Sequence, residues 1–444
     1  MSQNFIRDLG DGLILRRSTA KDAEALVAFH GDVHREPGSE EPEAYVAAWV
    51  QDLMQRTHPT FSPGDFTIVE DTRSGEIVSS LCLISQTWSY EGIPFGVGRP
   101  ELVGTHPAYR RRGLVRAQFE AIHQWSAERG EAAQAITGIP WYYRQFGYEM
   151  AMTLGGSRSG YKPDVPKLKD GEAESYRVRP AGEADLPFIA RVYEQGIKRY
   201  PVACARDDAL WRYELLGRSE KNVNRQELRV IETLEKDPVG FLAHRIYPWQ
   251  GRLGVWSYEL KPGVSWLAVT PSVVRYLWTW GEETAAQDPK LELVQFSFAL
   301  GAEHPVYQVF DKGLPRRAEP YAWYLRVADL PGFLGHIAPA LEQRLAASPL
   351  VGHSGEVKIS FYRSGLRLAF EQGRLETVES WQPTVEDGGN AAFPDLTFLQ
   401  LLFGYRSLEE LDGAYADCWT ESDEARALLE ALFAKRASDI WPVS

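Results

Sequence analysis

An internal repeat limits the possible fold of this chain more than any other feature of its sequence. Residues 13–30 (LILRRSTAKDAEALVAFH) read as a short strand, a loop and an amphipathic helix with Asp22 in its first turn. Residues 176–193 (YRVRPAGEADLPFIARVY) have the same design, with Asp185 in the equivalent place. Because self-similar segments mark repeated structural units, the sequence predicts two copies of one α/β unit.

Each unit continues in the same order, with paired strands, a further strand, a loop, a helix and an aromatic-rich tail. In the first unit these parts are residues 66–71, 76–90 and 101–105, a helix that stops at Gly130, and the tail 141–148. In the second unit they are strands at 227–235, 238–247 and 263–270, a helix at 272–283, and the tail 304–310. The Gly, Pro and Lys content of residues 157–175 indicates a linker between the units.

The pattern changes from about residue 321, where a strand enters a helix. Alternating apolar and polar residues then predict half-buried antiparallel strands at 356–362, 366–372 and 374–380. Two helices close the chain, at 395–404 and 422–436, and Ser422 is the expected N-cap of the second. We therefore expect α/β domains at 1–158 and 172–318, followed by an α+β domain at 319–444.

Composition narrows the class of ligand and the compartment. Asp and Glu (61) exceed Lys and Arg (48), which gives a formal charge of −13. This negative charge disfavours binding of nucleic acid and favours cationic ligands. The alternative is that the charge serves only to keep the protein in solution. The polar N-terminus has no signal-peptide pattern, and no apolar run is long enough for a membrane span. Three scattered cysteines, Cys82, Cys204 and Cys418, suit a reducing cytoplasm.

The most informative segment is residues 101–122 (ELVGTHPAYRRRGLVRAQFEAI). A strand ending at Thr105 leads to a loop with three arginines, and a helix begins near Leu114. The N–H groups at a helix N-terminus favour an anion, and Gly113 allows close approach of the backbone. These features together predict a pyrophosphate site, with an arginine-rich cap that serves solubility as the alternative.

The run from Tyr109 to Leu114 (YRRRGL) resembles the acetyl-CoA-binding motif of the GNAT acetyltransferases. The whole layout resembles the enhanced-intracellular-survival (Eis) acetyltransferases, with tandem GNAT folds on mixed central sheets and a sterol-carrier-like third domain. This resemblance implies an enzyme that binds acetyl-CoA through Val103, Thr105, Arg110, Arg111, Arg112, Gly113 and Leu114. Residues 270–278 (TPSVVRYLW) stand where the second unit would need this motif, so that unit is expected to be a scaffold.

Amide formation from a thioester needs a base for the amine and a proton for the thiolate. By the resemblance, Tyr143 in the first tail is the general acid, whereas Tyr142 and Tyr148 are interpreted as core residues. The resemblance also implies a terminal carboxylate as base, here that of Ser444. Glu101 is the second candidate base, because it shares strand parity with Val103 and Thr105 and would face the same cleft.

The implied reaction is direct acetyl transfer to a primary amine in a ternary complex, with an aminoglycoside, a polyamine or a lysine side chain as acceptor. The resemblance also implies a homo-oligomer, a trimer or a hexamer. No metal-ligand spacing, GxSxG elbow or phosphate-binding GxxxxGK[ST] loop occurs. An acyl-CoA-sensing regulator without turnover, and a lipid-binding module with a vestigial enzyme, are the alternatives.

Overall fold

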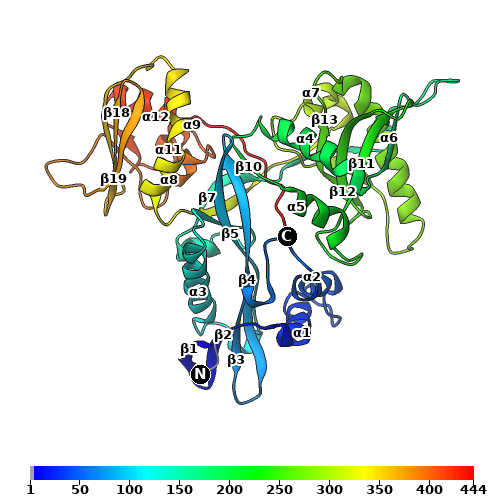
Figure 1. Cartoon of the computed structure of the whole chain (residues 1–444), viewed down its shortest axis with the longest axis horizontal. Coiled ribbons are helices and arrows are strands. Elements are labelled where there is room, and N and C mark those ends of the chain that lie inside the picture. Colours follow the sequence, from blue (N-terminus) through cyan, green and yellow to red (C-terminus); the bar gives the residue numbers. More distant parts are fainter. Residues whose placement is uncertain (1–4) are drawn as a thin grey trace.

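The computed structural model describes residues 5–444 and contains three β-sheets, each in its own lobe (Figure 1). The first sheet runs down the centre of the view, with the second on the right and the third on the left. The predicted class, α/β units on mixed sheets with an α+β part after them, is confirmed.

The first sheet has the order β1-β2-β3-β4-β5-β6-β16-β7, and β10 pairs with β4. Its strands are β1 (Phe5–Gly10), β2 (Leu13–Arg17), β3 (Phe66–Asp71), β4 (Glu76–Tyr90), β5 (Ile93–Thr105), β6 (Ala133–Ile136), β7 (Glu149–Leu154), β10 (Val202–Cys204) and β16 (Tyr321–Arg326). Helices α1 (Ala23–Val33) and α2 (Ala44–Gln55) pack on one face of this sheet, and α3 (Leu114–Glu128) packs on the other. The strands can bury both faces because successive side chains alternate between them.

The second sheet has the order β15-β8-β14-β13-β12-β11-β9. Its strands are β8 (Ser157–Tyr161), β9 (Tyr176–Pro180), β11 (Gln226–Thr233), β12 (Pro238–Arg245), β13 (Arg252–Leu260), β14 (Gln295–Phe298) and β15 (Arg316–Ala318). The helices of this lobe are α4 (Leu186–Ile197), α5 (Asp208–Arg212), α6 (Trp266–Ala285) and α7 (Val306–Val309).

The strand predicted at residues 263–270 is wrong, because most of this segment belongs to helix α6. Ser265 is the N-cap, and its side chain accepts a hydrogen bond from the Ala268 N–H. Pro271 lies in the second turn of the helix, and the carbonyl that it leaves unpaired belongs to Leu267, a residue that is 66% exposed. A short apolar run does not distinguish a buried strand from a helix, and the true strand is β13.

A duplicated arginine confirms the internal repeat. In the first unit, Arg16 donates from Nε to Glu70 and from Nη2 to Asp22, both at 2.7 Å. The second unit repeats this arrangement, with bonds of 2.8 Å, in Arg179, Asp185 and Glu232. In both units the arginine therefore ties the first repeat strand to the start of the helix and to a neighbouring strand.

The third sheet has the order β19-β18-β17-β20-β21. Its strands are β17 (Gly355–Ser360), β18 (Gly365–Glu371), β19 (Arg374–Trp381), β20 (Ala391–Ala392) and β21 (Trp419–Thr420). Its helices are α8 (Leu330–His336), α9 (Ala338–Ala346), α10 (Phe398–Leu402), α11 (Leu408–Ala414) and α12 (Asp423–Leu432). The three predicted antiparallel strands and the Ser422 N-cap are confirmed, whereas α11 was not predicted.

Strands cross between the sheets, so the sheets do not follow the order of the chain. Strand β16, from the start of the third predicted domain, lies between β6 and β7 of the first sheet. Strand β10, from the second unit, pairs with β4. The last residues of the chain return from the third lobe to a position beside α5 (Figure 1). The domain limits stay a prediction, and the observed pairing ties all three lobes together.

The longest helix, α6, has 20 residues. Across residues 5–444, none of the helices combines the length and the apolar composition that crossing a membrane requires.

Candidate active site

The arginine-rich loop joins β5 to α3, as the sequence predicts. Arg110, Arg111 and Arg112 are exposed, and Gly113 is the N-cap of α3 with a φ of 74°. A Cβ placed on Gly113 would meet no atom within 4 Å, so the space above the helix N-terminus is open. Open N–H groups beside three exposed guanidinium groups suit a pyrophosphate.

A cavity of about 710 Å³ lies above this loop, and all seven residues predicted to bind acetyl-CoA line it. They are Val103, Thr105, Arg110, Arg111, Arg112, Gly113 and Leu114. The sequence analysis missed several other lining residues, among them His34, Arg116, Ile139, Tyr142 and Phe146. Tyr142 had been interpreted as core, and His34 belongs to no motif, so neither had a usable sequence signal.

Two parallel strands separate beside the cavity. β5 pairs with β6 only at Val97 and Gly98, and from there to Thr105 its β6-facing backbone groups have no strand partner in residues 5–444. An extended ligand with amide groups, such as the pantetheine arm of coenzyme A, could hydrogen-bond to such an edge.

The parity argument for Glu101 is wrong. Leu102 has a φ of 56°, and the pairing of β4 with β5 shifts register beside it. This bulge interrupts the alternation: Glu101 lies opposite Cys82, which packs with Leu102 in the cluster under α1 and α2, whereas Val103 packs on the α3 side. Glu101 instead forms an ion pair with Arg99 and does not line the cavity.

Tyr143 lies on a short 3-10 helix, Tyr142–Phe146; Tyr142 and Phe146 line the cavity, whereas Tyr143 packs behind them and is not part of its lining. It is 4% exposed, and its ring lies 5.5 Å from that of Tyr324 and 6.0 Å from that of Phe119. Within residues 5–444 no hydrogen bond engages its hydroxyl. Burial raises the pKa of Tyr143, and Tyr142 and Tyr324 add to the rise, so the phenol stays protonated at neutral pH.

The corresponding tyrosine of the second unit is differently placed. The hydroxyl of Tyr307 donates to the Phe298 carbonyl at 2.8 Å and accepts from the Leu300 N–H at 3.2 Å. His304 Nε2 lies 2.7 Å from the carbonyl of Tyr258, on the strand that corresponds to β5. In the second unit these two side chains therefore hydrogen-bond to backbone groups of β13 and β14, whereas the Tyr143 hydroxyl has no hydrogen bond within residues 5–444.

The arginine loop of the first unit has a different counterpart from the one predicted. Residues 270–278 lie inside α6, and residues 261–265 (KPGVS) join β13 to that helix. This segment contains Gly263 but no arginine, so it lacks the cluster of guanidinium groups.

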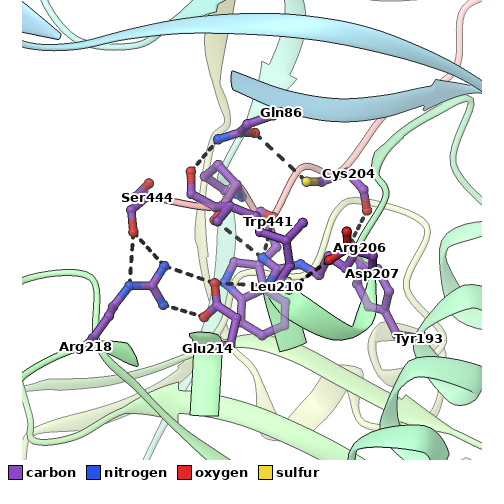
Figure 2. Close-up of polar contacts among 12 residues, drawn as sticks. Gln86, Tyr193, Cys204, Arg206, Asp207, Leu210, Glu214, Arg218, Trp441 and Ser444 are labelled. Atoms are coloured by element: carbon purple, nitrogen blue, oxygen red, sulfur yellow. Dashed lines mark hydrogen bonds and ion pairs between the residues drawn. The ribbon is translucent and has the colours of Figure 1, made fainter. Parts of the chain in front are cut away.

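Ser444 lies outside the cavity, in a buried network of charged groups (Figure 2). Arg218 donates from Nε and Nη2 to the main-chain oxygen of Ser444, at 3.1 and 2.8 Å. Arg218 also binds Glu214, which pairs with Arg206. Arg99 donates to Ser444 Oγ at 3.3 Å, so this arginine contacts both Glu101 and the side-chain hydroxyl of Ser444.

Tyr148 is a core residue, as predicted. It is fully buried, and its hydroxyl lies 2.9 Å from His123 Nε2. The part of the chain that the structure describes contains no group of three His, Cys, Asp or Glu side chains that could hold a metal ion.

Comparison with known proteins identifies the first unit. Residues 15–151 match the family model described as an acetyltransferase (GNAT) domain. No curated protein sequence matches the chain.

Similar solved structures span nearly the whole chain. A probable N-acyltransferase of unknown function from Enterococcus faecalis is 13% identical, with a TM-score of 0.68, covering 96% of this chain and 98% of that one. A GCN5-related N-acetyltransferase from Kribbella flavida is 18% identical, with a TM-score of 0.64 and coverages of 97% and 98%. Eis1 from Mycobacterium abscessus is 14% identical, with a TM-score of 0.60 and coverages of 97% and 99%. At these identities the likeness establishes the fold. Residues 15–151 thus match the acetyltransferase (GNAT) domain model, and the chain as a whole has a fold similar to that of solved structures described as GCN5-related N-acetyltransferases.

Proposed function

We propose that this chain transfers an acetyl group from acetyl-CoA to a primary amine by direct attack in a ternary complex. One observation carries the proposal, namely that the seven residues predicted to bind acetyl-CoA line a single cavity above the N-terminus of α3. The family match over residues 15–151 supports acyl transfer in general.

In this proposal the loop binds the pyrophosphate and the open edge of β5 binds the pantetheine arm. Arg110, Arg111 and Arg112 supply positive charge, and the N–H groups at the start of α3 donate hydrogen bonds. Acetyl-CoA supplies an activated acyl group as a thioester. Tyr143 donates a proton to the departing sulfur, and the desolvation that keeps its phenol protonated also raises the proton affinity of a thiolate.

The acceptor that we propose is a molecule with several amines, such as an aminoglycoside or a polyamine, or a lysine side chain. A net charge of −13 favours the approach of such cations. The scattered cysteines add a cytoplasmic location to the proposal, and the resemblance to the Eis acetyltransferases adds a trimer or hexamer. Light scattering of the purified chain would measure its oligomeric state.

Calorimetric titration with acetyl-CoA tests the central claim. We expect one site per chain, because the arginine loop occurs in the first unit alone, and thiol release should follow when a primary amine is added. Absence of binding over a wide concentration range would refute the proposed function and leave the arginine loop as a surface cap.

Arg111→Glu is expected to weaken acetyl-CoA binding by about 10- to 100-fold, the loss that follows from removing a charged hydrogen bond. Arg111 is exposed and, within residues 5–444, has no hydrogen bond or ion pair, so the fold should not suffer. The matched control is Arg191→Glu, at an exposed arginine of α4 that likewise has no partner among the described residues. Calorimetry of both variants measures the difference, and equal affinities would remove Arg111 from the site.

A second cavity supports a lipid-binding function as the other candidate. It has a volume of about 1090 Å³ and lies against the third sheet, with apolar walls that include Leu330, Phe361, Leu366, Leu396 and Phe398. The apolar residues of α12 are part of the core, and they are not among the residues that line this cavity. Retention of a fatty acid through gel filtration would favour this candidate.

A further inference from the structure

His34 occupies the side of the cavity formed by the end of α1. It is the C-cap of that helix, it is half-buried, and it lines the cavity together with Val103, Gly104 and Thr105. A Cβ at Gly104 would lie 2.6 Å from Val33 Cγ1 and 3.5 Å from His34 Cε1. Glycine at this position therefore lets the end of α1, with its histidine, lie directly against β5.

The hydrogen bonding of His34 determines which ring nitrogen is basic. Its Nδ1 lies 3.1 Å from the carbonyl oxygen of His30. A carbonyl can only accept, so Nδ1 carries the proton and Nε2 keeps a free electron pair. Within residues 5–444, no side chain or backbone group hydrogen-bonds to this Nε2. Burial lowers the pKa of His34 below its ordinary value of 6.5, so the ring is neutral at pH 7.

His30, which stacks on His34, does not compete with His34 for the proton. His30 stacks on His34 with a centroid distance of 5.4 Å and is fully buried. Burial lowers the pKa of His30 well below 6.5, so it stays neutral as well.

The two bases predicted from the sequence are both engaged by arginines. Arg99 forms an ion pair with Glu101, and Arg218 donates two hydrogen bonds to the main-chain oxygen of Ser444. A guanidinium group stabilises the unprotonated form of an acidic oxygen and makes it a weaker base. Both residues also lie outside the cavity lining.

The geometry points to His34 Nε2 as the general base for the acceptor amine, an assignment that rests on the proposed function. The amine nitrogen attacks the thioester carbonyl carbon, a C–N bond forms, and His34 takes the proton that the nitrogen loses. The C–S bond breaks, and Tyr143 gives its proton to the sulfur. Exchange with water then returns one proton to Tyr143 and removes one from His34, so the products are an amide and a thiol.

The charges that face His34 set how well it can perform this role. Across the cavity stand the phenols of Tyr109 and Tyr142 and the side chains of Arg110, Arg111, Arg112 and Arg116. Burial lowers the pKa of His34 and keeps the free imidazole neutral, while the hydrogen bond to the His30 carbonyl opposes this shift. Bound phosphates would add negative charge to the cavity and make protonation of His34 easier.

The test compares kcat/KM for spermidine, as the amine probe, between pH 5 and 9 in the wild type, His34→Asn and His34→Ala. Asparagine keeps an N–H donor near the position of Nδ1 but has no basic nitrogen. We expect kcat/KM to fall by about 100-fold or more, with loss of the decline in rate that protonation of His34 should give the wild type at acidic pH. Added imidazole should partly restore His34→Ala. The control is His336→Gln, at an exposed histidine bonded to the Pro94 carbonyl, which should keep the wild-type profile.

Each other outcome has a defined meaning. An unchanged profile in His34→Asn overturns the assignment and leaves acetyl transfer standing. Loss of acetyl-CoA binding by His34→Asn in calorimetry would show that His34 binds the acyl donor and does not act as the base. This result also overturns the assignment. Disappearance of the acidic decline in Glu101→Gln, with His34→Asn unchanged, would transfer the role to Glu101. A wild type that binds acetyl-CoA and acetylates no amine would overturn the assignment and the proposed function together.

Discussion

Tyr143→Phe is expected to lower kcat for acetyl transfer by about 10²- to 10⁴-fold, the range for loss of a positioned general acid. The variant removes one hydroxyl that is free of hydrogen bonds across residues 5–444, and the ring that packs on Phe119 and Tyr324 remains. The fold should therefore persist, and the affinity for acetyl-CoA should change by no more than about threefold. Thiol-release kinetics and calorimetry measure the two quantities.

Tyr307→Phe is the matched control, because it makes the same change in the second unit. This hydroxyl bonds to the carbonyl of Phe298 and the N–H of Leu300, so its loss should cost about 1–3 kcal/mol of stability. The rate of acetyl transfer at a temperature well below unfolding should remain that of the wild type. If instead Tyr143→Phe retained full activity, the acid would have to be water or another group of the cavity.

Arg218→Ala is expected to lower the free energy of unfolding by about 3–5 kcal/mol, as when one partner of a buried ion pair is removed. The side chains of Arg218 and Glu214 are each 2% exposed. The variant would remove both hydrogen bonds that Arg218 donates to the main-chain oxygen of Ser444. Glu214 would keep Arg206 as its remaining partner (Figure 2). Urea unfolding followed by tryptophan fluorescence measures the effect.

The comparison variant is Arg212→Ala, at the end of α5 and shortly before Arg218 in the sequence. Arg212 pairs with Glu183, but the two side chains are 65% and 51% exposed. Such a surface pair contributes about 0–1 kcal/mol, so this variant should unfold nearly like the wild type. Equal losses in the two variants would contradict a special contribution of the buried network.

The position of Arg218 also shows that the buried network joins segments that are far apart in the chain. Ser444, Gln86 and Arg218 come from the end of the chain, from β4 and from the second unit, yet they lie in one cluster. A network of this kind depends on three segments far apart in sequence, and no local pattern in any one of them predicts it. The Ser444 prediction came from resemblance, and the contacts that engage this residue were unforeseen.

The proposed acetyl-CoA site is the part of the protein that the sequence by itself determined. A strand, a short loop, a glycine with positive φ and an amphipathic helix are local features, because their hydrogen bonds join residues close in sequence. All seven predicted residues from Val103 to Leu114 accordingly line one cavity. The repeat was equally readable, since the Arg16 and Arg179 contacts lie within similar stretches of chain.

Only the tertiary structure decided which face Glu101 occupies, which sheet receives β16, and that His34 meets the cavity. A single bulge at Leu102 reverses strand parity, and alternation of side chains does not reveal a bulge in advance. Strand β16 pairs with β6 and β7 because these strands need hydrogen-bond partners, wherever in the sequence the partner lies. Local propensity acts over a few residues, whereas these three outcomes follow from pairing and packing between segments that are distant along the chain.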